Sequence, residues 1–126
     1  MAMDLAPRRF ADAVVLSPAG RLDHASADDF TTALLARLDA CAPGRDRVVL
    51  DLGGVEYIAS VGLRALMLAS RQAKTQGGTL VVAAMQPLVE EIFQISRFTL
   101  VFKTFPTVRD ALAELSPPAL SAFDAA

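Results

Sequence analysis

Short apolar runs and longer amphipathic stretches follow one another along this chain. A short apolar run is typical of a buried strand, and apolar positions three or four residues apart are typical of a helix. The runs predict strands at residues 8–10, 13–17, 48–52, 79–84 and 99–105. The helical spacing predicts helices from Ala27 to the Pro43-Gly44 pair, and at 60–76, 87–95 and 108–115. We expect Asp28 opposite the apolar stripe of the first helix, Leu88, Ile92 and Ile95 on the inward face of the third, and Thr107 as the cap of the last.

The order of these elements predicts an α/β fold. Ala11-Asp12 separates the first two strands and predicts a tight turn in an antiparallel hairpin. The later strands alternate with helices, which indicates parallel pairing through right-handed crossovers. We therefore expect a mixed sheet of four to five strands with an N-terminal hairpin and about four helices. The domain spans residues 8–115, with a flexible lead-in at 1–7 and a C-terminal tail at 116–126.

Composition narrows the class of protein. The chain has 126 residues, 53% of them hydrophobic, and a net charge of −2, which suits one domain with a sizeable core. There is no basic excess for direct nucleic-acid binding. Cys41 is the only cysteine, so no internal disulfide can form and a reducing compartment is expected. Cys41 lies on the apolar stripe of the first predicted helix, and we therefore expect it in the core. No apolar run could span a membrane, and the first residues lack the apolar core of a signal peptide, so we expect a cytoplasmic protein without membrane insertion.

The segment Val48–Leu63 is the most informative part of the chain. A buried strand is followed by Asp51, a glycine pair and an aromatic residue, and Ser60 then opens a helix. A helix start favours a phosphate through its free N–H groups and its partial positive charge, so Ser60 is a candidate phosphorylation site. An ordinary helix N-cap is the alternative, because capping serines are common.

The helix that starts at Ser60 predicts a docking surface. At about 100° per residue, one face points to the sheet and carries Leu63, Leu66, Met67 and Ser70, with Ala73 at its margin. The opposite face carries Val61, Arg64, Ala65, Leu68, Gln72 and Thr75. Val61 and Leu68 would then be exposed apolar residues beside Ser60, which suggests a docking surface. Single exposed apolar residues are also common without any function.

Enzymatic chemistry has little support in the residues. Ser60 lacks the G-x-S-x-G pattern of a nucleophile elbow, because Ile58 stands at the first glycine position. His24, the only histidine, has no orienting third group that the sequence identifies. Asp51 could suggest a phosphoaccepting receiver domain, but the acidic pair and the lysine of that class are missing. We interpret Asp51 as a carboxylate that bonds loop N–H groups. No metal-ligand cluster is present, and we expect no catalytic residue and no cofactor.

Four segments together resemble the STAS domains, specifically the bacterial anti-sigma-factor antagonists. The segments read GRLDHASADDF, VVLDLGGVEYIASVGLRAL, GGTLVVAAMQPLVEEIFQISRF and FKTFPTVRDALAEL. They cover roughly residues 8 to 115, and the second is the most specific. The resemblance implies a partner-switching module. Such a protein binds an anti-sigma factor with serine kinase activity, is released when that kinase phosphorylates it, and is reset by a phosphatase.

The resemblance also implies roles for single residues. Ser60 matches the serine that is phosphorylated, and Asp23 matches an acidic residue of the loop near it. His24 and Ser26 belong to the same loop, although Ser26 with Asp29 also has the spacing of a helix capping box. We therefore expect a partner-binding surface made of Asp23, His24, Ser26, Ala59, Val61, Gly62, Arg64 and Leu68. We expect a monomer or a weak dimer.

Two positions depart from the family pattern. Ala59 stands where the family usually has aspartate, and Val61 stands where it often has a second serine. The missing hydroxyl at Val61 leaves Ser60 as the acceptor. The missing carboxylate at Ala59 leaves a second interpretation open, in which the domain is a non-switching STAS subunit of a lipid transporter or a signalling scaffold.

Overall fold

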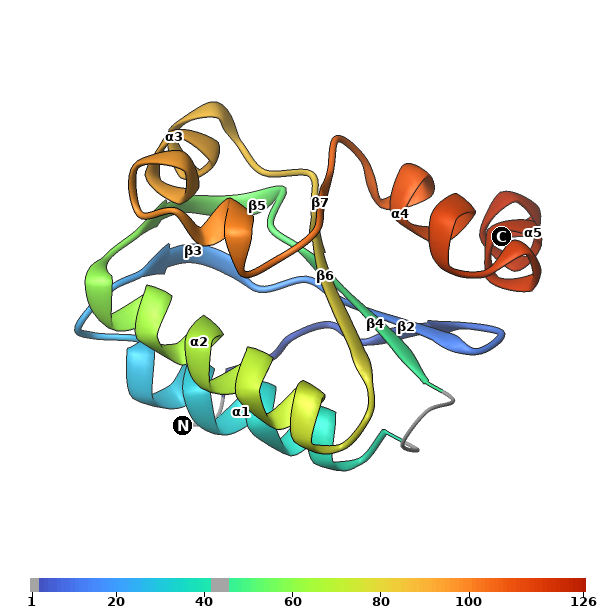
Figure 1. Cartoon of the computed structure of the whole chain (residues 1–126), viewed down its shortest axis with the longest axis horizontal. Helices are drawn as coiled ribbons and strands as arrows, with labels where there is room; N and C mark the ends of the chain where they lie inside the picture. Colours follow the sequence, from blue (N-terminus) through green and yellow to red (C-terminus); the bar gives the residue numbers. More distant parts are fainter. Residues whose placement is uncertain (1–2, 42–45) are drawn as a thin grey trace.

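A five-stranded mixed sheet forms the centre of the protein (Figure 1). The computed structural model describes residues 3–41 and 46–126, so the expected helix stop at Pro43-Gly44 lies outside the described residues. The sheet has the order β1-β2-β4-β6-β7. Its strands are β1 (Arg8–Phe10), β2 (Ala13–Leu16), β4 (Arg47–Asp51), β6 (Thr79–Ala83) and β7 (Thr104–Phe105).

The strand pairing confirms the predicted topology. β1 and β2 form the antiparallel hairpin around Ala11-Asp12, with Phe10 opposite Ala13. β2, β4, β6 and β7 then pair in parallel, with Val48 next to both Val14 and Leu80. Each parallel step needs a crossover on one face of the sheet, and helices provide these crossovers.

A second, two-stranded sheet was not predicted. It pairs β3 (Ala19–Leu22) with β5 (Gly54–Ile58) in parallel, with an irregularity between Gly20 and Arg21. The sequence of β3, AGRL, has no apolar run, so its strand conformation comes from pairing with a distant segment. The two segments that the resemblance places at the functional site follow directly from this small sheet. The loop with Asp23 follows β3, and Ser60 follows β5.

The helices cover both faces of the main sheet. α1 (Ala27–Asp39) and α2 (Ser60–Thr75) pack on one face, and α4 (Val108–Leu115) and α5 (Pro117–Ala125) pack on the other. β4 shows how the alternation of a strand serves two cores. Val48 and Leu50 belong to the core under α1 and α2, while Val49 belongs to the core under α4 and α5.

The third helix differs in part from expectation. α3 (Pro87–Ile95) has the predicted bounds, and Thr107 caps α4 as predicted by accepting a hydrogen bond from the Asp110 N–H. However, Val89 and Phe93 of α3 are buried, whereas Leu88 and Ile95, predicted to point inward, are 49% and 75% exposed. Phe93 determines which face of α3 points inward, because its ring packs against two further phenylalanines, Phe98 and Phe102.

The predicted strand at 99–105 is wrong over most of its length. Residues Phe98–Leu100 form a 3₁₀ helix, η1, and only Thr104–Phe105 pair with the sheet as β7. Phe98 and Phe102 are both buried, and their rings stack at 6.3 Å. The Phe102 N–H donates to the Phe98 carbonyl at 2.9 Å, and this turn brings residues four apart to the same side. Residues four apart also share one side of an extended strand, so the apolar pattern could not separate the two.

Both ends of the domain extend beyond the predicted bounds. Leu5, expected in a flexible lead-in, is buried, and its carbonyl accepts a hydrogen bond from the Ser17 N–H at 2.6 Å. The expected tail instead contains α5, whose Phe123 ring meets the Phe10 ring edge-on at 5.3 Å.

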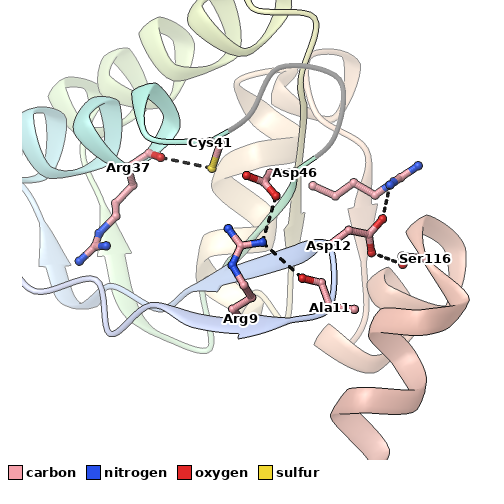
Figure 2. A network of polar contacts seen from close by, with 8 residues as sticks. Arg9, Ala11, Asp12, Arg37, Cys41, Asp46 and Ser116 are labelled. Atoms are coloured by element: carbon pink, nitrogen blue, oxygen red, sulfur yellow. Dashed lines mark hydrogen bonds and ion pairs between the residues drawn. The ribbon is translucent and has the colours of Figure 1, made fainter.

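A polar network holds the start of α5 against the β1–β2 hairpin (Figure 2). The buried Ser116 hydroxyl donates to the Asp12 carboxylate, which also pairs with Arg47. In the same region Arg9 pairs with Asp46 at 3.0 Å, and the Cys41 thiol donates to the Arg37 carbonyl. Cys41, predicted in the core, is only half-buried against it, and this burial raises the pKa of its thiol.

Candidate partner-binding site

Ser60 is the first residue of α2 and is exposed. The residue in the N-cap position is Ala59, so the expected alternative of Ser60 as an ordinary N-cap is wrong. Ala59 has no side-chain oxygen, and no side chain caps the helix. The Ser60 hydroxyl has no hydrogen-bond partner among the described residues, which leaves it available to another molecule.

The backbone around Ser60 is held tightly although the hydroxyl is free. The Ala59 N–H donates to the Leu22 carbonyl at 2.8 Å, which joins the end of β3 to the start of α2. Gly62 is buried, and a Cβ added there would lie 2.8 Å from the Leu22 oxygen and 2.8 Å from Ile58 Cγ1. The close approach that Gly62 permits is therefore to the Leu22 backbone of its own chain.

The loop after β3 lies next to this helix start and is ordered by its own polar contacts. The Ser26 hydroxyl donates to the Arg21 carbonyl at 2.7 Å and accepts from the Asp23 N–H at 3.1 Å. The predicted capping box is therefore absent, because this hydroxyl makes no bond to the first turn of α1. Asp23 also accepts a hydrogen bond from the Ala25 N–H at 3.1 Å. Ser26 thus fixes the loop that presents Asp23.

Two residues that were not predicted to act at the site support Asp23. The Arg21 guanidinium lies 4.5 Å from the centre of the Tyr57 ring and 3.5 Å from the Asp23 carboxylate. Arg21 and Tyr57 are neighbours in the β3–β5 register. Only this unpredicted pairing reveals the contact, because the two residues lie far apart in the sequence. The stacked arginine orients the carboxylate at the edge of the site.

A groove between α1 and α2 begins beside Ser60. It has a volume of about 310 Å³, and its walls are His24, Ala27, Asp28, Thr31, Val61, Arg64, Ala65 and Leu68. The structure therefore brings four of the expected partner-binding residues to one groove: His24, Val61, Arg64 and Leu68. Asp28 and Thr31 were not expected there, since the sequence indicated only that Asp28 faces away from the core of α1.

The outward face of α2 is more covered than expected. Val61 and Leu68 are half-buried, and Ala65, predicted on the solvent side, is only 1% exposed. The reason is that α1 packs directly against α2, so this helix is covered on two sides, whereas the sequence argument allowed only for the sheet. Arg64 remains exposed at the rim of the groove.

Other candidate chemistry is accounted for by local structure. Asp51 accepts hydrogen bonds from the Gly53 N–H at 2.9 Å and the Ser17 hydroxyl at 3.2 Å, as predicted for a strand-end carboxylate. Over residues 3–41 and 46–126, no group of histidine, cysteine or acidic side chains has the arrangement of a metal site. Within the same residues, no helix is long and apolar enough to cross a membrane.

Comparison with known proteins places this chain in one family. The family model described as the STAS domain matches residues 5–111. The chain therefore belongs to the STAS domain family, as the sequence motifs indicated.

Relatives within the family are named as regulators. A protein of Bordetella bronchiseptica named "Putative anti-sigma factor antagonist BtrV" is 40% identical over 83 residues, which cover 66% of this chain and 69% of that protein. The crystal structure of an anti-sigma factor antagonist from Mycobacterium paratuberculosis is 25% identical and superposes with a TM-score of 0.75, covering 86% of this chain and 90% of that chain.

The same fold also occurs in a transporter family. A sulfate transporter family protein from Wolinella succinogenes has a TM-score of 0.70 at 17% identity, covering 90% of this chain and 88% of that chain. At this identity the likeness shows the fold alone. The membership in the anti-sigma-factor antagonist group therefore rests on the family match, the relatives and the motif around Ser60.

Proposed function

We propose that this protein is an anti-sigma-factor antagonist that works by partner switching in the cytoplasm. In its unphosphorylated form it binds an anti-sigma factor that has serine kinase activity, and this frees a sigma factor for transcription. The kinase then transfers the γ-phosphoryl group of ATP to the Ser60 oxygen, which loses its proton, and ADP is released. The phosphorylated protein leaves the kinase, and a phosphatase hydrolyses the phosphoserine to reset the cycle.

The observation that carries this proposal is the state of the Ser60 hydroxyl. It is exposed and unbonded at the start of α2, beside a groove that contains four of the eight expected partner-binding residues. A phosphate carries about −1.5 to −2 charge at neutral pH. The start of a helix tolerates such a charge, so phosphorylation is expected to preserve the fold and to change the docking surface.

Ala59 gives a reason to consider the second function. A non-switching STAS subunit of a lipid transporter or signalling scaffold would keep this fold and would not need a phosphorylated serine. The absence of a carboxylate at residue 59 fits that role, because the family usually has aspartate before the phosphorylated serine.

Phosphorylation by a cognate kinase separates the two functions. The purified protein is incubated with ATP and an anti-sigma factor kinase encoded beside it, and the phosphate is located by mass spectrometry. We expect one phosphate, on Ser60, and none in the Ser60→Ala variant. A protein that stays unmodified with every cognate kinase would contradict the switching model and favour the non-switching subunit.

Binding of variants tests the same model without catalysis. We expect Ser60→Asp to weaken kinase binding by at least about tenfold, equivalent to about 1.4 kcal/mol, because a negative charge then meets the docked partner. Ser60→Ala should bind constitutively. Ser121→Asp is the matched control, because Ser121 is an exposed serine on α5, far from the groove. Equal binding by the Ser60→Asp and Ser60→Ala variants would contradict the proposal.

A further inference from the structure

Arg64 lies on the same side of α2 as Ser60. The helix begins at Ser60, and residues four apart in a helix are neighbours on its surface. Arg64 is exposed at the rim of the groove between α1 and α2. It makes no ion pair or hydrogen bond through its side chain with any described residue. Arg64 is therefore an unengaged cation within reach of the Ser60 oxygen.

The other charged groups around this groove differ from Arg64 in position or in partners. Arg21 of β3 is already paired with Asp23 and stacked on Tyr57. His24 and Asp28 line the groove from the loop and from α1. The first turn of α2 holds no acidic residue, and Ala59 before it carries no charge. No carboxylate on α2 competes for Arg64 or repels a phosphate at Ser60.

We propose that Arg64 is a positioning residue for the phosphorylated state, in which its guanidinium binds the phosphate on Ser60. This inference rests on the proposed phosphorylation of Ser60. It adds the contact through which the phosphate changes the surface around it. A guanidinium matches a phosphate with two parallel hydrogen bonds, which a lysine cannot reproduce.

The pair would change more of the docking surface than the phosphate alone. Arg64 lines the groove together with Val61 and Leu68, where a partner of the unphosphorylated protein would dock. When Arg64 turns to the phosphate, it leaves that position. Phosphorylation of one serine thus alters two side chains of the surface, and the exchange is confined to the first turns of α2.

The acidity of the phosphate tests the pair directly. The full chain is prepared with phosphoserine installed at position 60 during translation, so that no kinase is needed, and the second pKa of the phosphate is measured by ³¹P NMR. A neighbouring cation favours the dianion and lowers this pKa. We expect Arg64→Gln to raise it by roughly 0.3 or more, the shift that corresponds to a helical pair of one turn. Arg64→Lys should restore only part of the difference.

Arg71→Gln is the matched control, because it removes the same charge from an exposed position later on the same helix. It should leave the pKa of the phosphate unchanged. His24 is an ionisable residue that lines the same groove, so the comparison is repeated with His24→Gln, and the effect of Arg64 should persist. Asp23, Asp28 and Arg21 are present in every variant and contribute equally.

The possible results separate this inference from the proposed function. Equal pKa values in the parent and the Arg64→Gln variant, or an equal rise with Arg71→Gln, would overturn the pair. A kinase that does not modify Ser60 would overturn the proposed function, and the titration would still decide the pair because the phosphate is installed independently.

Discussion

Two serines at helix starts occupy opposite regions of this protein. Ser116 stands before α5, is only 3% exposed, accepts a hydrogen bond from the Ala119 N–H and donates to Asp12. Ser60 begins α2, is exposed, and its hydroxyl has no partner among the described residues. The two helix starts lie at opposite sides of the molecule (Figure 1). A serine at a helix start is thus structural in one region and available for chemistry in the other.

The difference lies in which groups hold each region together. Around Ser116, side chains from distant segments form the contacts, so the Ser116 hydroxyl is already engaged in hydrogen bonds that hold the fold. Around Ser60, the backbone makes the contacts, through the Leu22–Ala59 hydrogen bond and the close packing at Gly62. A site assembled by its backbone keeps its geometry while the side chain remains free for modification.

The largest effect is expected from Gly62→Ala. Replacing a glycine with alanine inside a helix normally stabilises the protein. Here the new Cβ would lie 2.8 Å from the Leu22 backbone oxygen, which cannot move easily. We expect a loss of about 1–3 kcal/mol in the free energy of unfolding, as for other overpacked sites, together with weaker partner binding. Urea unfolding measures the first and calorimetric titration the second.

Gly78→Ala is the control for that variant, because the only atom near its added Cβ is 3.6 Å away, an ordinary contact. It should have a much smaller effect. If Gly62→Ala leaves the free energy of unfolding unchanged, the start of α2 shifts readily. That result would contradict the conclusion that the backbone holds the region of Ser60 tightly.

Ser116→Ala is expected to have the next largest effect on the free energy of unfolding, and no effect at Ser60. Loss of the helix cap should cost about 1 kcal/mol of stability, while phosphorylation of Ser60 continues unchanged. Ser121→Ala, on the exposed side of α5, should cost little. A defect in Ser60 phosphorylation in a folded Ser116→Ala protein would contradict the independence of the two regions.

The same variant should change the pH dependence of stability. The hydrogen bond from Ser116, with help from Arg47, holds the pKa of Asp12 below its ordinary value of 3.8. A lowered pKa in the folded state stabilises the protein above that ordinary value, and the contribution is lost as the pH falls through the folded-state pKa. Ser116→Ala should therefore lose less stability on acidification than the parent, as urea unfolding at neutral and acidic pH would show.

Leu68→Asp should have the smallest effect on stability and a clear effect on binding. Leu68 is half-buried in the wall of the groove. We expect a stability loss below about 1 kcal/mol and a partner affinity reduced by about tenfold, because a charge replaces an apolar contact. Thr75→Asp places the same charge on the last turn of α2, outside the groove. An unfolded Leu68→Asp protein would mean that this side chain belongs to the core.

Much of the main sheet could be predicted because its strands are continuous apolar runs. The hairpin, the parallel strands β4 and β6, and the bounds of α3 and α4 follow from local patterns. The exposure of Ser60 and the contacts of Asp51 also agree with local reasoning. These features depend on nearby residues, which is why one sequence suffices for them.

The remainder depends on contacts between distant segments. β3 exists because it pairs with β5, and Ala65 is buried because α1 covers α2. Ser26 has a capping sequence, yet its hydroxyl bonds to Arg21 because that loop returns on itself. α5 is held by Phe10 and Asp12, from the other end of the chain. No periodicity in a single segment contains this information.

The parallel pairing of β3 with β5 also determines when the site can exist during folding. α1 and β4 separate the two strands in the sequence, so their pairing closes a long loop and is expected to form late. Until it forms, Asp23 and Ser60 are not neighbours, and the groove is absent. A short peptide around Ser60 should therefore be a poor kinase substrate, which would restrict phosphorylation to chains that have completed folding.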